Sequence, residues 1–158
     1  MDHHFRTLCG IGLLIVSLFA PLSVNAQAEN GPVGYVIIPA LDLYHPVYFV
    51  PIIDHAYSED ALIRRVGWLQ GTSWIHDDWG RVVLAGHSYG VFTDLNLLRA
   101  GDRVIVGDSA GAVVYRVTGW QIVGVDDTTW LQPTSEPTLL LITCSDANRL
   151  VVYAEKEN

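Results

Sequence analysis

Residues Thr138 to Cys144 read TLLLITC, and residues Arg149 to Glu155 read RLVVYAE. Both are short apolar runs rich in branched side chains, and only the four residues SDAN (145–148) separate them. Apolar runs of this length bounded by turn residues are typical of buried β-strands. The C-terminal end is therefore predicted to be a pair of strands. If they are neighbours in a sheet, Arg149 at the start of the second lies near Cys144 at the end of the first.

Similar segments recur along the rest of the chain. Residues Arg81 to Ala85 (RVVLA) form an apolar, β-branched run that predicts another buried strand. Weaker helical patterns occur at 58–65 and 91–99. Further strands are predicted at 34–40, 44–53, 102–106 and 112–125. About seven or eight short strands with one or two short helices predict an all-β barrel or sandwich.

The first 28 residues have a different character. Arg6 precedes an uncharged run whose apolar centre is 8–20, and small residues follow at 24–28. This order is typical of an export signal that is cleaved at the small residues. The uncharged run is also about long enough to span a bilayer as a helix, so a retained membrane anchor is the alternative. We expect residues 1–28 to be a signal peptide or N-terminal membrane anchor, and 31–158 to be one exported domain.

Charge and cysteine content narrow the possible functions. The 158 residues carry a formal net charge of −8 with one lysine, Lys156, and the arginines are scattered, so no basic face for nucleic acid is visible. Of the two cysteines, Cys9 lies in the export segment and Cys144 in the exported domain. The domain therefore cannot form an internal disulfide. A lone thiol outside the cell is either used or buried, and at this point both interpretations stay open.

Residues 86–90 (GHSYG) match the G-x-S-x-G motif of serine hydrolases and follow the predicted strand at 81–85. In such an enzyme Ser88 would be the nucleophile, with a histidine base later in the chain. The six histidines are at positions 3, 4, 45, 55, 76 and 87, and none follows Ser88. A serine hydrolase is therefore the least favoured alternative.

Cysteine chemistry fits the chain better. A thiol becomes a strong nucleophile as a thiolate, and a nearby histidine can accept its proton and later protonate a leaving amine. Fixed donors must also stabilise the charge that develops on the attacked carbonyl. Cys144 and His87 each follow a predicted buried strand, and Arg149 begins the next strand. These three residues are the candidate catalytic set.

Five stretches share one order and spacing: GYVIIPA (34–40), VLAGHS (83–88), FTDLNLLRAGDRVIV (92–106), LITC (141–144) and RLVV (149–152). Together they resemble the sortase family. In this resemblance His87 matches the catalytic histidine of that family, Cys144 its catalytic cysteine in a TLxTC-like signature, and Arg149 the arginine that leads its last strand.

The resemblance implies an eight-stranded β-barrel with one or two short helices and a transpeptidase that acts outside the membrane. Cys144 would attack a Thr–Gly-type bond in an LPxTG-like C-terminal sorting signal and form a thioacyl enzyme. His87 would protonate the departing amine and then activate the incoming one, and Arg149 would position the substrate and stabilise the oxyanion. The substrates would be surface proteins or pilins. The acceptor would be an amine of a cell-wall precursor, a pilin lysine or water.

The chain departs from the family pattern in two places. Leu140 stands at the first position of the TLxTC signature, and the interval from Cys144 to Arg149 is shorter than in the family. Arg116 is the alternative arginine if the barrel places it inward, although its strand pattern predicts a surface position.

Two other interpretations stay open. A non-catalytic exported β-domain that binds a peptide or the cell wall would have a buried, unreactive Cys144. No cofactor is expected, but Ca²⁺ binding by loop residues is possible in principle, at His76-Asp77-Asp78, Asp126-Asp127 or Glu59-Asp60. Solvated loop acids are the simpler interpretation of these residues. Trp130, in the loop before the strand that carries Cys144, is expected in core or loop packing, or along a substrate groove.

Overall fold

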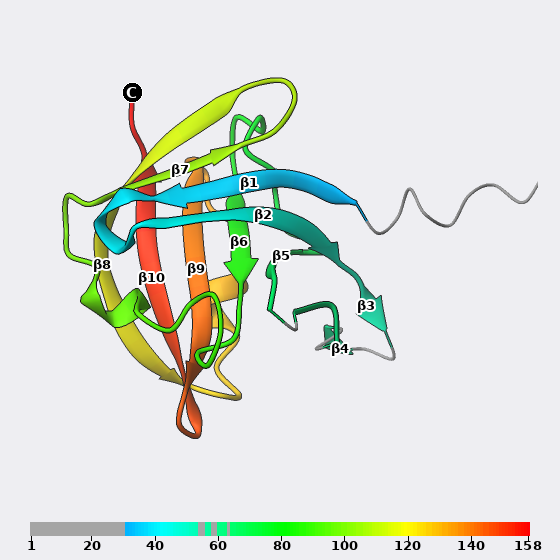
Figure 1. The fold of residues 1–158 in the computed structure, drawn as a ribbon, viewed down its shortest axis with the longest axis vertical. Helices are drawn as coiled ribbons and strands as arrows, with labels where there is room; N and C mark the ends of the chain where they lie inside the picture. The colour runs from blue at the N-terminus through cyan, green and yellow to red at the C-terminus, as the bar shows by residue number, and fades with distance from the viewer. Residues whose placement is uncertain (1–30, 54–55, 58–59, 63) are drawn as a thin grey trace, which may run out of the picture.

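A computed structural model describes residues 31–53, 56–57, 60–62 and 64–158, and the predicted export segment lies outside them. Eight strands close into a barrel in the order β1-β2-β5-β6-β9-β10-β8-β7 (Figure 1). They are β1 (Pro32–Ile38), β2 (Leu43–Val50), β5 (Val66–Leu69), β6 (Arg81–Ala85), β7 (Arg103–Gly107), β8 (Ala112–Gly124), β9 (Thr138–Ser145) and β10 (Asn148–Lys156). The predicted eight-stranded barrel is therefore confirmed, and the sandwich alternative is not.

The remaining elements are short. Strands β3 (Ile52–Ile53) and β4 (Ala56–Tyr57) form a small separate hairpin, so the single strand expected at 44–53 is divided into β2 and β3. Within the helix expected at 58–65, the described residues include one 3-10 turn, η3 (Asp60–Leu62), and residues 58, 59 and 63 lie outside the described part; the helix expected at 91–99 is reduced to one 3-10 turn, η4 (Leu95–Leu97). Two further turns are η2 (Pro39–Leu41) and η5 (Thr129–Leu131). No helix in the described part of the chain is long and apolar enough to cross a membrane.

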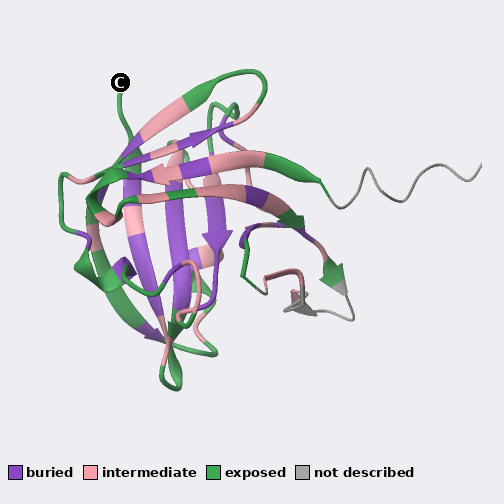
Figure 2. Ribbon diagram, in the orientation of Figure 1, coloured by how far each residue is buried: buried purple, intermediate pink, exposed green. Residues whose placement is uncertain are grey.

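The strands β6, β9 and β10 are buried on both faces, which Figure 2 shows as long buried stretches. Successive side chains of a strand point to opposite faces. In β9, Leu139 and Leu141 belong to the cluster inside the barrel, whereas Leu140 and Ile142 belong to a second cluster on the outside. This double burial explains why the sequence of β9 is continuously apolar rather than alternating.

The outer cluster is covered by segments that cross over the barrel wall. Trp130 of η5 packs into it, together with Leu62 of η3 and Tyr57 of β4. The barrel therefore carries an apolar layer on its outer face at β6, β9 and β10, and the site described below is built on this layer.

The inner core should depend on Leu141, which is fully buried. We expect Leu141→Ala to lower the free energy of unfolding by about 2–5 kcal/mol, because it removes transfer energy and leaves a cavity. Leu97→Ala is the matched control, since Leu97 is exposed, and it should change stability by no more than about 0.5 kcal/mol. Urea unfolding followed by circular dichroism measures both, and equal effects would contradict this packing.

Candidate active site

The ends of β6 and β9 bring His87 and Cys144 to the same edge of the barrel. The two strands pair in parallel with Ala85 opposite Ile142, and the Gly86 amide donates to the Ile142 carbonyl at 3.0 Å. His87 and Cys144 each lie two residues beyond these partners. Neighbouring strands are about 4.8 Å apart, so the parallel register brings the backbone of both residues to adjacent positions.

The hairpin of β9 and β10 places Arg149 directly opposite Cys144. Only Asp146 and Ala147 form its turn, and Asp146 adopts a left-handed φ of 53°, which Asp tolerates better than most residues. Cα partners in an antiparallel pair present their side chains on one face. The short interval between Cys144 and Arg149, which departs from the family pattern, is therefore the interval that this tight turn requires.

The three candidate residues differ in exposure. The Cys144 side chain is a free, exposed thiol, which is the opposite of the buried cysteine that the non-catalytic interpretation predicts. His87 is buried, with 9% of its surface accessible. Arg149 is half-buried, and no carboxylate in the described part of the chain forms a salt bridge with its guanidinium. Its five donors are therefore not committed to a neighbouring acid.

An apolar groove of about 290 Å³ runs along the outer face of the barrel beside Arg149. Its floor includes Ala85 and Ile142, and Cys144 follows Ile142 by two residues on the same face of β9, at the end of this floor. The groove is lined by Tyr57, Leu62, Leu69, Ala85, Val125, Thr128, Trp130, Leu131, Ile142 and Arg149. An apolar channel that leads to a thiol and a guanidinium suits an extended peptide with apolar side chains.

Two walls of this groove are held by specific hydrogen bonds. The Arg81 guanidinium donates to the Trp130 carbonyl, and its Nε donates to Thr138 Oγ1 at 3.3 Å, which ties η5 to the barrel. Burial lowers the pKa of Arg81, but an arginine remains charged. On the opposite side the Tyr57 hydroxyl donates to the Gln70 carbonyl at 3.2 Å, and burial raises the pKa of this phenol, which keeps it a donor.

Comparison with known protein families shows to which family the chain belongs. The family model described as the sortase domain matches residues 36–157. The chain belongs to the sortase family. Sortases are cysteine transpeptidases, and the cysteine–histidine–arginine set predicted above has the residue types that this chemistry needs.

Solved structures agree with the family assignment. Sortase C1 from Streptococcus agalactiae is 28% identical, with a TM-score of 0.71 over 81% of this chain and 68% of that protein. Sortase C from Clostridium perfringens SM101 is 27% identical, with a TM-score of 0.69 over 82% and 72%. The Clostridium perfringens sortase C structure with the C-terminal cell wall sorting motif is also 27% identical, with a TM-score of 0.70 over 82% and 72%. No curated protein sequence matches this chain.

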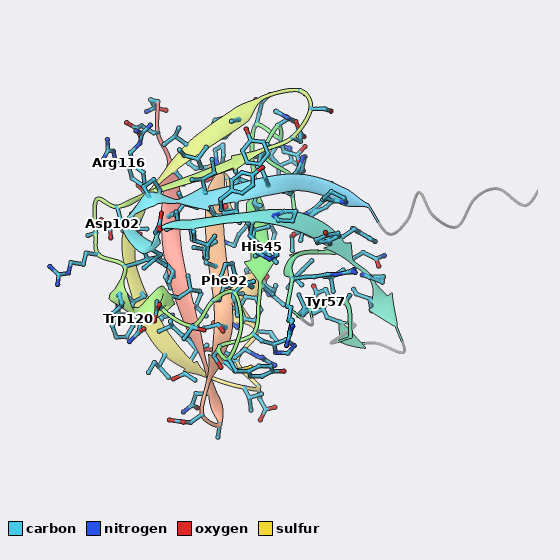
Figure 3. All side chains as sticks on the ribbon, in the orientation of Figure 1. His45, Tyr57, Phe92, Asp102, Arg116 and Trp120 are labelled. Atoms are coloured by element: carbon cyan, nitrogen blue, oxygen red, sulfur yellow. The ribbon has the colours of Figure 1, made fainter. Side chains whose placement is uncertain are left out.

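The fold of this sortase does not favour the other candidate nucleophile or the other arginine. A serine elbow needs a helix after its strand, whereas β6 is followed by turns and the single 3-10 turn η4, so Ser88 does not sit in such an elbow. Arg116 is exposed on β8 and points away from the barrel (Figure 3). Its guanidinium donates to the Gly101 carbonyl at 3.0 Å and to Glu157 at 2.9 Å. Its predicted surface position is confirmed.

Two of the acids considered for Ca²⁺ accept hydrogen bonds within their own loops. Among the described residues no group of three or more His, Cys, Asp or Glu side chains is arranged to hold a metal. Asp77 accepts from the Trp74 amide at 2.8 Å, and Asp127 accepts from the amide and hydroxyl of Thr129, which lower its pKa. The side chains of Glu59 and Asp60 lie outside the described part. His76 Nε2 lies 2.9 Å from Asp108 Oδ1.

Sequence reasoning found the three polar candidates but, apart from Trp130, missed the groove. Tyr57, Leu69 and Val125 come from segments that are far apart in the chain, and no local pattern links them. The one available signal was the continuously apolar sequence of β6 and β9. It indicates that their outer faces are covered, but it does not say by which segments.

The Asp108 cluster should make stability sensitive to acid. His76 first, then Trp74 Nε1 at 2.7 Å and the Ala110 amide at 2.8 Å, hold the pKa of the Asp108 carboxyl well below its usual range. The stabilisation is therefore complete above the unfolded-state pKa of about 4 and is lost as pH falls below it. As pH falls from 5 to roughly 2.5, we expect the free energy of unfolding of Asp108→Asn to decrease less than that of the unmodified protein.

Urea unfolding at several pH values measures this difference. Trp74→Phe removes one of the donors while keeping an aromatic ring, so its pH dependence should lie between those of the other two proteins. If the free energy of unfolding changes with pH in the same way in the unmodified protein and in Asp108→Asn, the assigned hydrogen bonds are contradicted.

Proposed function

We propose that this protein is an exported sortase that cleaves an LPxTG-like C-terminal sorting signal at a Thr–Gly-type bond and transfers the new carboxyl end to an amine. The observation that carries the proposal is the placement of Cys144 opposite Arg149, at the end of an apolar groove and beside the strand that leads to His87. The related sortase C that was solved with a cell wall sorting motif supports this class of substrate.

The chemistry proceeds in two steps, and His87 moves a proton in each of them. The Cys144 sulfur attacks the threonine carbonyl carbon, and the resulting oxyanion is stabilised by the Arg149 guanidinium. His87 gives a proton to the glycine nitrogen as the peptide C–N bond breaks, which leaves a thioester on Cys144. The incoming amine then attacks the thioester, loses its proton to His87 and releases the thiolate.

Export is part of the proposal and rests on the sequence alone. The positive end, apolar centre and small-residue tail of residues 1–28 would deliver the barrel to the outer face of the membrane, as a secreted domain or held by an anchor. The substrates would then be surface proteins or pilins with a C-terminal sorting signal. The acceptor would be an amine of the cell wall, a pilin lysine or water.

The first test follows the covalent intermediate. The purified protein is incubated with quenched fluorescent LPxTG-type peptides and a glycine-based amine, and the acyl adduct is located by mass spectrometry after proteolysis. We expect cleavage, a ligated product and an adduct on Cys144. Cys144→Ala should show only background cleavage, because no other thiol lies in the barrel.

Two control variants sharpen this test. Cys9→Ser removes the other thiol of the chain and should keep full activity, and Ser88→Ala should keep most of it. Activity that survives in Cys144→Ala but disappears in Ser88→Ala would replace the sortase mechanism with serine chemistry. A folded, alkylatable Cys144 that forms no adduct with any peptide would favour a peptide-binding domain without catalysis.

The second test concerns Arg149. A lysine keeps the charge but cannot reproduce the planar fork of a guanidinium. We expect Arg149→Lys to lower kcat by about 100-fold, the usual effect of removing an oxyanion donor. Arg116→Lys is the matched control and should leave steady-state kinetics unchanged, since Arg116 lies on the outer surface of another strand. A fully active Arg149→Lys enzyme would overturn this role.

A further inference from the structure

An exposed tyrosine covers the face of the candidate catalytic histidine. The rings of His87 and Tyr89 are stacked with their centroids 4.7 Å apart and their planes inclined by 18°. Tyr89 is 79% exposed, whereas His87, whose ring it covers, is only 9% exposed. A large aromatic side chain that is so exposed contributes little to the core, so its contact with the imidazole is the feature that needs an explanation.

The loop after β6 is built to bring Tyr89 back over His87. The His87 carbonyl accepts from the Gly90 amide at 3.1 Å and from the Phe92 amide at 3.3 Å, which folds residues 87–92 into a compact turn. Thr93 Oγ1 closes the turn further by donating to the Gly90 carbonyl at 2.7 Å. Phe92 is fully buried beneath the loop and anchors it to the barrel (Figure 3).

Gly86 allows this loop to sit close to the barrel. A Cβ atom at that position would lie 2.9 Å from Phe92 Cδ2 and 2.9 Å from Val91 Cγ2. The absence of a side chain therefore lets Phe92 pack against the residue that precedes His87. The turn that carries Tyr89 is fixed at both ends, by the end of β6 and by the buried phenylalanine.

Stacking affects an imidazole in a specific way. It covers one face of the ring and leaves both nitrogens at the free edge, where hydrogen bonds and proton transfers occur. The ring can then no longer rotate freely about its side-chain bonds. The electron-rich face of the phenol also attracts the imidazolium that forms when His87 takes a proton from an amine.

We propose that Tyr89 is a positioning residue of this sortase: its ring holds the His87 imidazole in the orientation that directs a nitrogen toward Cys144 and the reacting amine. The inference rests on the proposed function, in which His87 moves the proton in both steps. Tyr89 does not line the groove. Its effect should therefore be on turnover and not on peptide binding.

The test compares Tyr89→Leu, which keeps apolar bulk, with Tyr89→Phe, which keeps the aromatic face. We expect Tyr89→Leu to lower kcat by about tenfold with KM changed less than about twofold, because orientation is lost while binding is kept. Tyr89→Phe should restore most of the rate, since it lacks only the hydroxyl. Trp79→Leu is the matched control: it removes another exposed aromatic side chain and should behave like the unmodified enzyme.

A second readout does not depend on activity. Nuclear magnetic resonance of the full chain with labelled histidine should show the ring-current shift of the His87 carbon-bound protons. The shift should persist in Tyr89→Phe and disappear in Tyr89→Leu, while the thermal unfolding midpoints of the variants stay close together. An unshifted His87 in the unmodified protein would show that the stack does not persist in solution and would overturn the proposal.

The outcomes separate this inference from the function on which it rests. If the unmodified protein forms the Cys144 adduct but Tyr89→Leu has the same kcat, Tyr89 has no positioning role. A raised KM with an unchanged kcat would move Tyr89 to the substrate-binding surface and also overturn the proposal. If no adduct forms in any variant, the proposed function has failed, and the resonance shift alone then decides whether Tyr89 orders His87.

Discussion

Because β6 and β9 pair in parallel, these two buried strands end at the same edge of the barrel. The rest of the site depends on this register. Ala85 lies opposite Ile142, so His87, two residues after β6 ends, and Cys144, two residues further along β9, lie close to each other along the backbone. A parallel pair cannot be closed by a tight turn and needs a long crossover. Residues 86–137 form that crossover, and they include β7, β8 and the turn that carries Tyr89. The strand pairing that joins the histidine to the cysteine thus also determines which segments surround them.

The second constraint is the double burial of β9. Its inner leucines fill the barrel, and its outer residues form the floor of the groove, so a change of register by one residue would exchange the two faces. The groove exists because η5 and the segment of β4 and η3 pack over this outer face. Arg81 holds η5 in place through the Trp130 carbonyl. The charged side chain of Arg81, on β6, thereby positions the groove wall that η5 forms. The contacts that build the groove are also the contacts that complete the outer core.

Several features of the site could be read from local patterns. The apolar runs at 81–85 and 138–144 are confirmed as strands, and the closed barrel agrees with the number of strands that was expected. The helical pattern at 91–99 was wrong beyond a single 3-10 turn, and the described residues of 58–65 include one such turn. In 91–99 the buried residues Phe92, Leu95 and Leu98 have near-helical spacing because the loop packs onto the open end of the barrel. Tertiary packing can produce an apolar period without a helix.

The sequence by itself determined which candidate residue types the chain offers and near which strand end each of them lies. It does so because strands have a period of two and are marked by local composition, and because the short connection between the last two strands favours a hairpin that brings Arg149 near Cys144. Only the tertiary structure decided the neighbours: the parallel contact of β6 with β9, the origin of the groove walls, and the stack of Tyr89 on His87. The strand contact and the groove walls join segments that are far apart in the chain, where no local pattern links them, and the stack depends on a loop that is held by the burial of Phe92. The free energy of closing the barrel selects them, and local propensity does not.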